Sequence, residues 1–201
     1  MKVLGLAGGS GSGKGYVASL FASRSIVSID TDAVYRDLVS GPGECMAELI
    51  AAFGKDIATE DGALDRAAMR RLVFSSELAE DNRARLNEIA HRHVLSEVRR
   101  KISELRKTNA PAVLVDAPLL FESGFDKECD AVISVVAPVD VRVSRIMKRD
   151  GISSEAAYAR ISTQISDAEL LSRSDFVINN CGDSSVLMAD INRICDFVFQ
   201  S

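Results

Sequence analysis

A glycine-rich segment near the start of the chain limits the possible fold more than any other feature. It reads GGSGSGK and fits the pattern G-x-x-x-x-G-K on Gly8, Gly13 and Lys14. An apolar run over residues 3–7 precedes the segment, and a helix-forming stretch over residues 17–22 follows it. This order of strand, loop and helix is the context in which the pattern binds phosphate, so the sequence predicts a phosphate-binding loop.

The chemistry of the loop follows from its residue types. Glycines let successive backbone N–H groups turn toward one point, the following helix offers unpaired N–H groups, and Lys14 adds a positive charge. The Ser or Thr that usually follows the lysine and ligates Mg²⁺ is absent, because Gly15 and Tyr16 stand there. The chain therefore holds its metal in another way or is a weakened catalyst. A flexible turn without nucleotide is the alternative, which the surrounding pattern disfavours.

Composition sets limits on partners. With 201 residues, the chain is long enough for one sizeable core or a core with small inserted lobes. The formal net charge of −5 provides no overall positive field, so we expect no nucleic-acid partner and a local pocket for any polyanion. The apolar run at the N-terminus is too short for a secretory segment, and no later run approaches the length of a membrane span.

The cysteines and histidines do not suggest a metal site. The four cysteines contain no C-x-x-C pair, which disfavours a disulfide framework and a zinc site and favours thiols in a reducing, cytoplasmic setting. The two histidines, His91 and His93, are two residues apart, and on a helix this spacing turns their rings to different faces.

Alternating apolar runs and helical periodicities predict an α/β fold. Short apolar runs are typical of parallel strands that are buried on both faces. They lie at residues 3–7, 26–30, 112–116, 131–136 and 176–178. Helical periodicities lie between them, at residues 46–53, 66–74, about 77–106, 139–149, 155–165 and 185–199. The alternation predicts a doubly wound, mostly parallel five-stranded sheet with ligands at the carboxyl ends of the strands.

Two helical segments interrupt this core. The stretch between the second and third strands is far longer than a single crossover needs, so we expect a helical substrate lobe at about residues 37–109. A charged helical segment at about residues 148–172 is expected to form a lid over the phosphates. We interpret residues 1–201 as a single domain of the P-loop kinase type. Its core is predicted to comprise residues 1–36, 110–147 and 173–201.

Carboxylates follow two of the predicted strands. Asp30 and Asp32 come after the second strand, where a carboxylate can accept the proton of an attacking hydroxyl. Because Asp also favours helix N-caps, we expect one of the two to cap the next helix, and we assign the chemistry to Asp32. Asp116 ends the third strand and is expected to orient Mg²⁺, directly or through water.

One run is far more specific than these features. Residues 116–124, DAPLLFESG, closely resemble a segment of the dephospho-coenzyme A kinases. Other stretches agree with that family in order and spacing along essentially the whole chain. They include the loop of residues 8–14, Asp30 and Asp32, the stretch DGALDR at residues 61–66, His91, Arg145, Arg149, Gln164 and Asn180.

The resemblance implies an activity and a set of site residues. It implies transfer of the ATP γ-phosphoryl group to the ribose 3′-hydroxyl of dephospho-CoA, which gives CoA and ADP, with Mg²⁺ accompanying ATP. It assigns Lys14 and Asp32 to catalysis, Asp32 being the base. It assigns Arg66 and His91 to the acceptor. The implied ATP site comprises Gly11, Ser12, Gly13, Lys14, Gly15, Tyr16, Arg145, Arg149 and Asn180.

Three departures from the family pattern are visible. Gly15 and Tyr16 replace the usual hydroxyl residues, Arg92 replaces a proline, and Arg142 replaces a glutamine. A nucleoside or nucleoside-monophosphate kinase is the nearest alternative function, because it would share the loop, lid and acidic strand end. A non-catalytic nucleotide-binding regulator is the other, and Gly15 is the feature that suggests it. The sequence does not indicate an oligomeric state.

Overall fold

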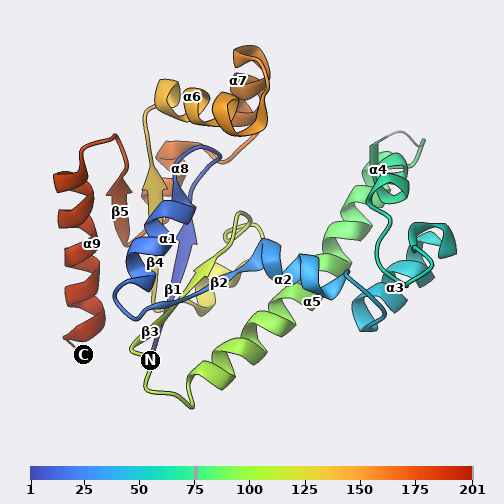
Figure 1. The fold of residues 1–201 in the computed structure, drawn as a ribbon, viewed down its shortest axis with the longest axis horizontal. Helices are drawn as coiled ribbons and strands as arrows, with labels where there is room; N and C mark the ends of the chain where they lie inside the picture. Colours follow the sequence, from blue (N-terminus) through green and yellow to red (C-terminus); the bar gives the residue numbers. More distant parts are fainter. Residues whose placement is uncertain (75–76, 201) are drawn as a thin grey trace. The chain divides into compact units, whose positions relative to one another are not determined.

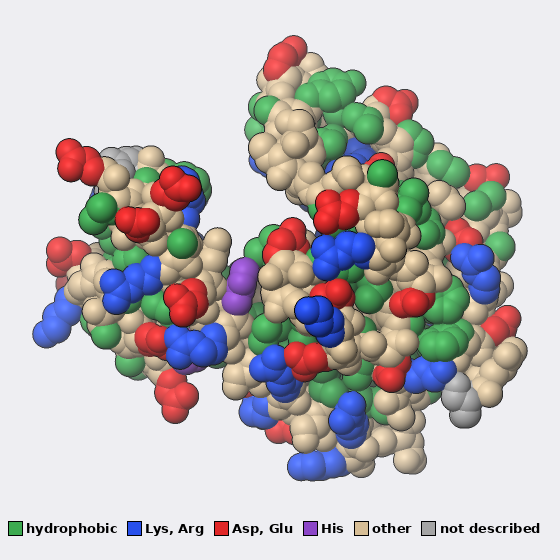
Figure 2. Space-filling view, turned by 180° about the vertical axis from the view of Figure 1, so that it is seen from behind, with side chains coloured by type: hydrophobic (Ala, Val, Ile, Leu, Met, Phe, Trp, Pro, Cys, Tyr) green, Lys and Arg blue, Asp and Glu red, His purple; other side chains and the backbone are tan. Residues whose placement is uncertain are grey.

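A computed structural model of the chain describes residues 1–74 and 77–200 (Figure 1). The chain forms two compact units, and each is described by itself. Unit 1 comprises residues 1–29 and 104–201, and unit 2 comprises residues 30–103. Within the described residues, no helix combines the length and apolar character that crossing a membrane requires. On the face seen in Figure 2, Lys and Arg side chains lie among Asp and Glu side chains over each unit.

A five-stranded sheet is the centre of unit 1. Its strands are β1 (Lys2–Ala7), β2 (Val27–Asp30), β3 (Ala112–Asp116), β4 (Ala131–Val136) and β5 (Phe176–Asn179). They lie in the order β2-β3-β1-β4-β5, and β1 pairs in parallel with both β3 and β4. From β1 the chain forms β2 and β3 on one side of that strand and then crosses to form β4 and β5 on the other side. This order confirms the doubly wound α/β fold. The loop of residues 8–14 leaves the carboxyl end of β1, where this topology places ligands.

Two helices cover one face of this sheet. They are α1 (Lys14–Ala22) and α9 (Ser184–Phe199). Both helices share a hydrophobic core with Leu4 and Leu6 of β1. The helix residues in this core are Val17 and Phe21 of α1 and Leu187, Ile191, Ile194, Cys195 and Val198 of α9. The other face of β1 is packed so closely that a Cβ at Gly5 would lie 2.8 Å from Leu120. The sheet is thus buried on both faces, which is why its strands appear as apolar runs in the sequence.

Three helices lie between β4 and β5, and the last two fall within the charged segment predicted at about residues 148–172. They are α6 (Val139–Asp150), α7 (Ser154–Ser162) and α8 (Asp167–Ser172). Val143 and Ile146 of α6 pack against Ala157 of α7. The sequence predicted one helix over residues 155–165, but α7 ends at Ser162, and Ser166 then caps α8. The prediction was wrong at this end because Ser, like other N-cap residues, favours the start of a new helix.

Helices also form unit 2. They are α2 (Thr31–Leu38), α3 (Glu44–Phe53), α4 (Arg66–Phe74) and α5 (Ala79–Leu105), which continues into unit 1. Short 3-10 helices lie at Lys55–Ile57 in unit 2 and at Phe125–Glu128 in unit 1. A core that includes Met46, Leu49, Met69 and Ile89 joins α3, α4 and α5.

The stretch DGALDR forms the turn before α4. Ala58 and Leu64 form an isolated antiparallel bridge, and Gly62 adopts a φ of 81° between them. The Asp65 carboxylate then accepts hydrogen bonds from the backbone N–H groups of Ala67 and Ala68. Asp65 therefore satisfies free amides at the start of α4 and fixes where Arg66 lies.

Candidate functional site

The backbone of the glycine-rich loop has the conformation that the sequence predicted. Gly8, Gly11 and Gly13 have φ values of 146°, 77° and 94°, a region that residues with a Cβ rarely adopt. Gly13 is the N-cap of α1 and provides no side chain to its first amides. The first turn of α1 therefore presents N–H groups and the positive end of a helix dipole toward an anion.

Lys14 folds back across the loop. Its Nζ donates a hydrogen bond to the carbonyl of Gly8 at 3.1 Å and lies 3.9 Å from Oδ1 of Asp116. Both side chains are mostly buried, with 16% and 17% of their surfaces exposed. Because β1 and β3 are parallel neighbours, their carboxyl ends bring this ammonium and this carboxylate together. The pair combines a charge for phosphate with a carboxylate of the type that Mg²⁺ prefers.

Arg145 and Asn180 hold the other side of the loop. Arg145 of α6 donates from Nη1 to the carbonyls of Gly11 and Ser12 at 3.1 and 3.2 Å. Asn180, which follows β5, donates from Nδ2 to the carbonyl of Ser12 at 2.8 Å. Nη2 of Arg145 reaches the carbonyl of Asn180 at 3.2 Å, so the two side chains form one connected group. Two residues that the sequence assigned to the ATP site therefore contact the loop.

A pocket of about 430 Å³ opens beside this part of the loop. Its volume falls within the range of small-molecule sites. Tyr16, half exposed, provides an aromatic side chain to it, and Asp183 provides a carboxylate. Asp183 also caps α9, and hydrogen bonds from the hydroxyl and backbone N–H of Ser185 lower its pKa. The lining residues are Gly13, Tyr16, Arg145, Asn180, Gly182, Asp183, Ser184 and Leu187.

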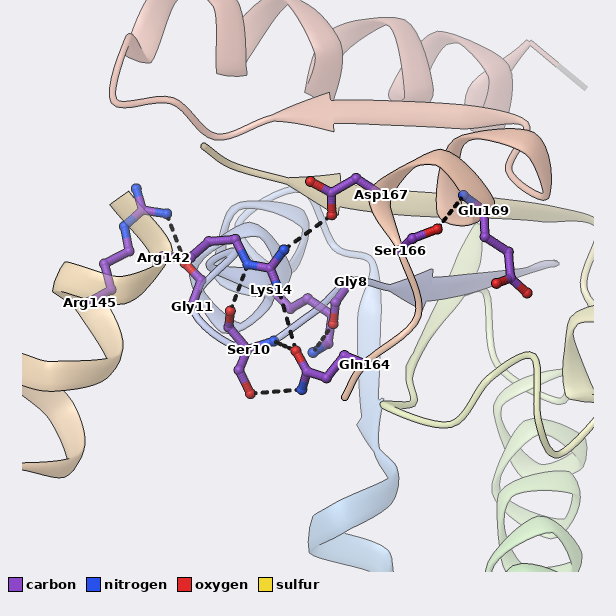
Figure 3. A network of polar contacts seen from close by, with 10 residues as sticks. All are labelled: Gly8, Ser10, Gly11, Lys14, Arg142, Arg145, Gln164, Ser166, Asp167 and Glu169. Carbon is purple, nitrogen blue, oxygen red and sulfur yellow. Dashed lines mark hydrogen bonds and ion pairs between the residues drawn. The ribbon is translucent and has the colours of Figure 1, made fainter. Parts of the chain in front are cut away.

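A second arginine contacts the tip of the loop, as Figure 3 shows. Arg142 of α6 is 3% exposed, and its Nε donates to the carbonyl of Ser10 at 3.0 Å. Its other nitrogens reach Asp167 and Gln164 at 3.1 and 3.2 Å. Gln164 also accepts the backbone N–H of Ser10 at 2.9 Å. The helical segment expected to form a lid thus touches the loop directly through Gln164 and indirectly through Asp167, which binds Arg142.

Arg149 occupies a different environment from Arg145. Its guanidinium pairs with Asp150 at 2.7 Å and is largely exposed. Arg160 also pairs with Asp150, and hydrogen bonds from the two arginines, with Arg149 contributing more, hold the pKa of Asp150 well below its usual range. The structure therefore brings Lys14, Asp116, Arg145 and Asn180 together and leaves Arg149 in an ion-pair cluster of its own.

Asp30 and Asp32 have distinct positions in unit 2. The Asp30 carboxylate accepts hydrogen bonds from the backbone N–H groups of Asp32 and Ala33 at 2.8 and 3.1 Å. Asp30 is therefore the N-cap of α2, as was expected for one of the two residues. Asp32 lies in the first turn of α2 and is exposed.

The predicted acceptor residues also lie in unit 2. Arg66 begins α4 and is exposed, and its positive charge acts on the phenol of Tyr35. Burial nevertheless raises the pKa of Tyr35, because desolvation outweighs the effect of Arg66. His91 lies on α5 and is partly exposed.

The residues next to His91 bind another helix of the same unit. Nε2 of His93 lies 2.7 Å from Oε2 of Glu48, and Arg92 pairs with the same carboxylate. Hydrogen bonds from Arg92 and His93 lower the pKa of Glu48. Arg92, which stands where a proline is usual in the resembling family, thus helps to attach α5 to α3.

The sequence did not indicate that Arg142 and Gln164 contact the loop, or that Asp167 pairs with Arg142. A signal for Arg142 was present, because it precedes Ile146 by four residues on the buried face of α6. A charged residue on such a face must find partners, since an unpaired buried charge is costly. Which partners it finds depends on the tertiary fold.

Similarity to known proteins agrees with this geometry. Residues 2–185 match the dephospho-CoA kinase family. A dephospho-CoA kinase of Corynebacterium glutamicum is 37% identical over 191 residues, which are 95% of this chain and 94% of that protein.

Solved structures show the same architecture. A crystal structure from Thermus thermophilus has a TM-score of 0.79 and 32% identity, and the match covers 98% of this chain and 97% of that one. A dephospho-CoA kinase from Campylobacter jejuni has a TM-score of 0.71 at 24% identity, covering 98% of this chain and 96% of that one. The second likeness shows the fold alone.

Two glycines of the loop give a matched prediction. At Gly13, an added Cβ would lie 2.1 Å from Nδ2 of Asn180 at a φ of 94°, whereas at Gly15 it would meet no atom within 4 Å. We expect Gly13→Ala to lower the free energy of unfolding by about 2 kcal/mol. Gly15→Ala, inside α1, is expected to raise it by about 1 kcal/mol. Denaturant unfolding of both variants measures the contrast, and equal effects would contradict the loop conformation described.

Proposed function

Because the chain belongs to the dephospho-CoA kinase family and phosphorylates dephospho-CoA with ATP in the last step of CoA synthesis, we propose that the loop of residues 8–14 holds the ATP phosphates. One observation carries this proposal. The N-terminus of α1, the ammonium of Lys14 and the carboxylate of Asp116 meet at the carboxyl ends of neighbouring strands. These are the groups that phosphoryl transfer requires for a nucleotide and its metal.

The pocket beside the loop is the proposed site of the nucleoside part of ATP. It adjoins Gly13, so a nucleotide with its phosphates on the loop has its base and ribose within reach of Tyr16 and Asn180. Arg145 adds a cation between this pocket and the loop carbonyls. We also assign Arg149 to the ATP site from the family resemblance, although in this structure it pairs with Asp150.

The transfer itself moves a phosphoryl group between two oxygens. The 3′-hydroxyl oxygen attacks the γ-phosphorus, the bond to the bridging oxygen breaks, and ADP leaves. We propose that Asp32 accepts the hydroxyl proton, since Asp30 is already the N-cap of α2. Lys14 stabilises the negative charge on the phosphoryl oxygens. Arg66 and His91 are the proposed acceptor-binding residues, and unit 2 the proposed acceptor lobe.

Mg²⁺ is proposed to accompany ATP, and the residues present fit a loosely held ion. Among residues 1–74 and 77–200, no cluster of three or more His, Cys, Asp or Glu side chains could form a metal cage. Mg²⁺ commonly keeps several waters and binds one or two carboxylates plus substrate phosphates, so a cage is not required. Asp116 would hold it, directly or through water. When bound, the ion neutralises charge that develops on the β- and γ-oxygens.

Free thiols support a cytoplasmic setting for this reaction. All four cysteines are free, and burial raises the pKa of Cys45, Cys129 and Cys195. Thiols persist in reducing compartments, where disulfides are rare.

The first test asks which acceptor is phosphorylated and whether Lys14 is required. With ATP and Mg²⁺, we expect phosphate on dephospho-CoA and not on a panel of nucleosides and nucleoside monophosphates. Lys14→Ala should remove about 3 kcal/mol of transition-state stabilisation, the typical contribution of such a group. The rate should therefore fall by roughly two orders of magnitude. The exposed Lys107→Ala is the matched control. A Lys14→Ala rate within about threefold of wild type would contradict the assignment of the loop.

The second test concerns the base. Asp32→Asn keeps the shape of the side chain but removes its basicity, so we expect kcat to fall by roughly 10² with unchanged ATP affinity. Asp30→Asn is the matched control, because Asn is as good an N-cap as Asp. A loss of ATP affinity in Asp32→Asn would assign Asp32 to the metal site instead, and a larger loss of kcat in Asp30→Asn would reverse the two roles.

The third test concerns the missing hydroxyl. A Cβ at Gly15 meets no atom within 4 Å, so a serine side chain fits there. If the hydroxyl adds a ligand to the cation, Gly15→Ser should lower the Mg²⁺ concentration for half-maximal rate. Initial rates at saturating ATP measure this for wild type, Gly15→Ser and Tyr16→Phe. An unchanged titration in Gly15→Ser with a strong shift in Tyr16→Phe would show that Tyr16 has taken over the role.

A further inference from the structure

Arg142 is a buried cation that the proposed reaction does not use. Only 3% of the residue is exposed, although arginine is among the residues that are almost never fully buried without a partner. Its guanidinium donates to Ser10 of the loop, to Asp167 of α8 and to Gln164, which precedes α8 (Figure 3). One side chain thus joins three segments of unit 1.

The contacts converge on the backbone at the tip of the loop. The N–H of Ser10 donates to Oε1 of Gln164 at 2.9 Å, and the carbonyl of Ser10 accepts from Arg142 at 3.0 Å. The Ser10 hydroxyl accepts from Nε2 of Gln164 at 3.1 Å. Both backbone hydrogen-bonding groups of this residue are therefore engaged by side chains outside the loop.

The electrostatics of this group depend on Asp167. Its carboxylate lies 3.1 Å from Nη1 of Arg142 and is itself partly exposed, with 39% of its side-chain surface accessible. A buried guanidinium without a counter-charge is strongly unfavourable, so Asp167 compensates Arg142. Asp167 lies in the first turn of α8. The position of α8 is therefore tied, through Arg142, to the loop.

The same arrangement orients two other parts of the site. Arg145 follows Arg142 by three residues on α6, so the anchor at Ser10 also fixes the stretch of helix that directs Arg145 to Gly11. At Gly9, a Cβ would lie 2.1 Å from Nη2 of Arg142, so the guanidinium occupies the space that a side chain would need. The loop and the arginine are fitted to each other at this point.

We propose that Arg142 is a positioning residue for ATP. Together with Gln164 and Asp167 it forms what we name the Ser10 latch, which holds the tip of the loop and Arg145 in the arrangement that binds the nucleotide. This inference rests on the proposed function, in which the loop is the ATP site. The latch lies wholly within unit 1, so its loss affects the nucleotide and leaves the affinity for dephospho-CoA unchanged.

Steady-state kinetics of Arg142→Met and Asp167→Asn test the latch. Methionine fills much of the volume without charge or donors, and asparagine keeps the shape of Asp167 without its charge. We expect each substitution to raise the KM for ATP by about tenfold, because small misplacements of binding groups are costly. The KM for dephospho-CoA should stay within about twofold. This split separates positioning of ATP from general damage to the fold.

Glu169→Gln is the matched control. Glu169 lies on α8 two residues after Asp167 and pairs with Arg173, so its substitution removes the same charge from the same helix without touching the latch. Its kinetics should equal those of wild type. Arg142→Lys, which keeps the charge but lacks the planar fork, should fall between wild type and Arg142→Met. In the Arg142→Met background, Asp167→Asn should have no further effect on the KM for ATP.

Because Asp167 is partly exposed, Asp167→Asn is expected to fold even if Arg142→Met does not. An unchanged KM for ATP in Asp167→Asn, an equal rise of both KM values, or an equal effect of Glu169→Gln would each overturn the latch. The Lys14→Ala variant distinguishes failure of the latch from failure of the proposed function. If Lys14→Ala is inactive and the latch variants behave as wild type, the loop is the ATP site and the latch alone is wrong.

Discussion

A loop that directs its backbone N–H groups toward an anion turns its carbonyl groups outward, and each of those carbonyls needs a donor. The positive φ angles at Gly8, Gly11 and Gly13 create this situation. Side chains from two other segments, α6 and the residue after β5, and from the loop itself satisfy it. The donors are Lys14 for Gly8, Arg142 for Ser10, Arg145 for Gly11 and Ser12, and Asn180 for Ser12. Much of the site can be understood from this one requirement, because buried polar groups without partners are costly.

The donors determine how the rest of unit 1 is connected. Arg142 and Arg145 both belong to α6, so the helix is attached to the loop at two points one turn apart. Arg142 in turn binds Asp167, which brings α8 into the same group. The proposed phosphate site and the segment expected to cover it are therefore parts of one hydrogen-bonded network. Arginine suits this role, because its planar group carries five donors and remains charged even when buried.

Much of the fold was predictable because the signals are local. The strands are buried on both faces and appear as apolar runs, and the predicted bounds at β4 agree with the structure. The phosphate loop was predictable because its conformation requires glycine at fixed positions. The end of α7 was predicted wrongly, since Thr163 and Gln164 fit a continuing helix by pattern alone. Gln164 instead leaves the helix and bonds to Ser10, a residue 154 positions away.

The sequence alone determined the type of fold, the position of the glycine-rich loop and the family. Each of these depends on residue types at short spacing or on ordered motifs along the chain. The sequence left open which of two aspartates caps the next helix. Only the tertiary structure decided that Asp30 caps α2, that Arg92 and His93 bind Glu48, and that Arg142 contacts Ser10. The reason is physical. A buried or paired charge takes its partner from whichever segment packs beside it, and that segment is distant in sequence and unmarked by any periodicity.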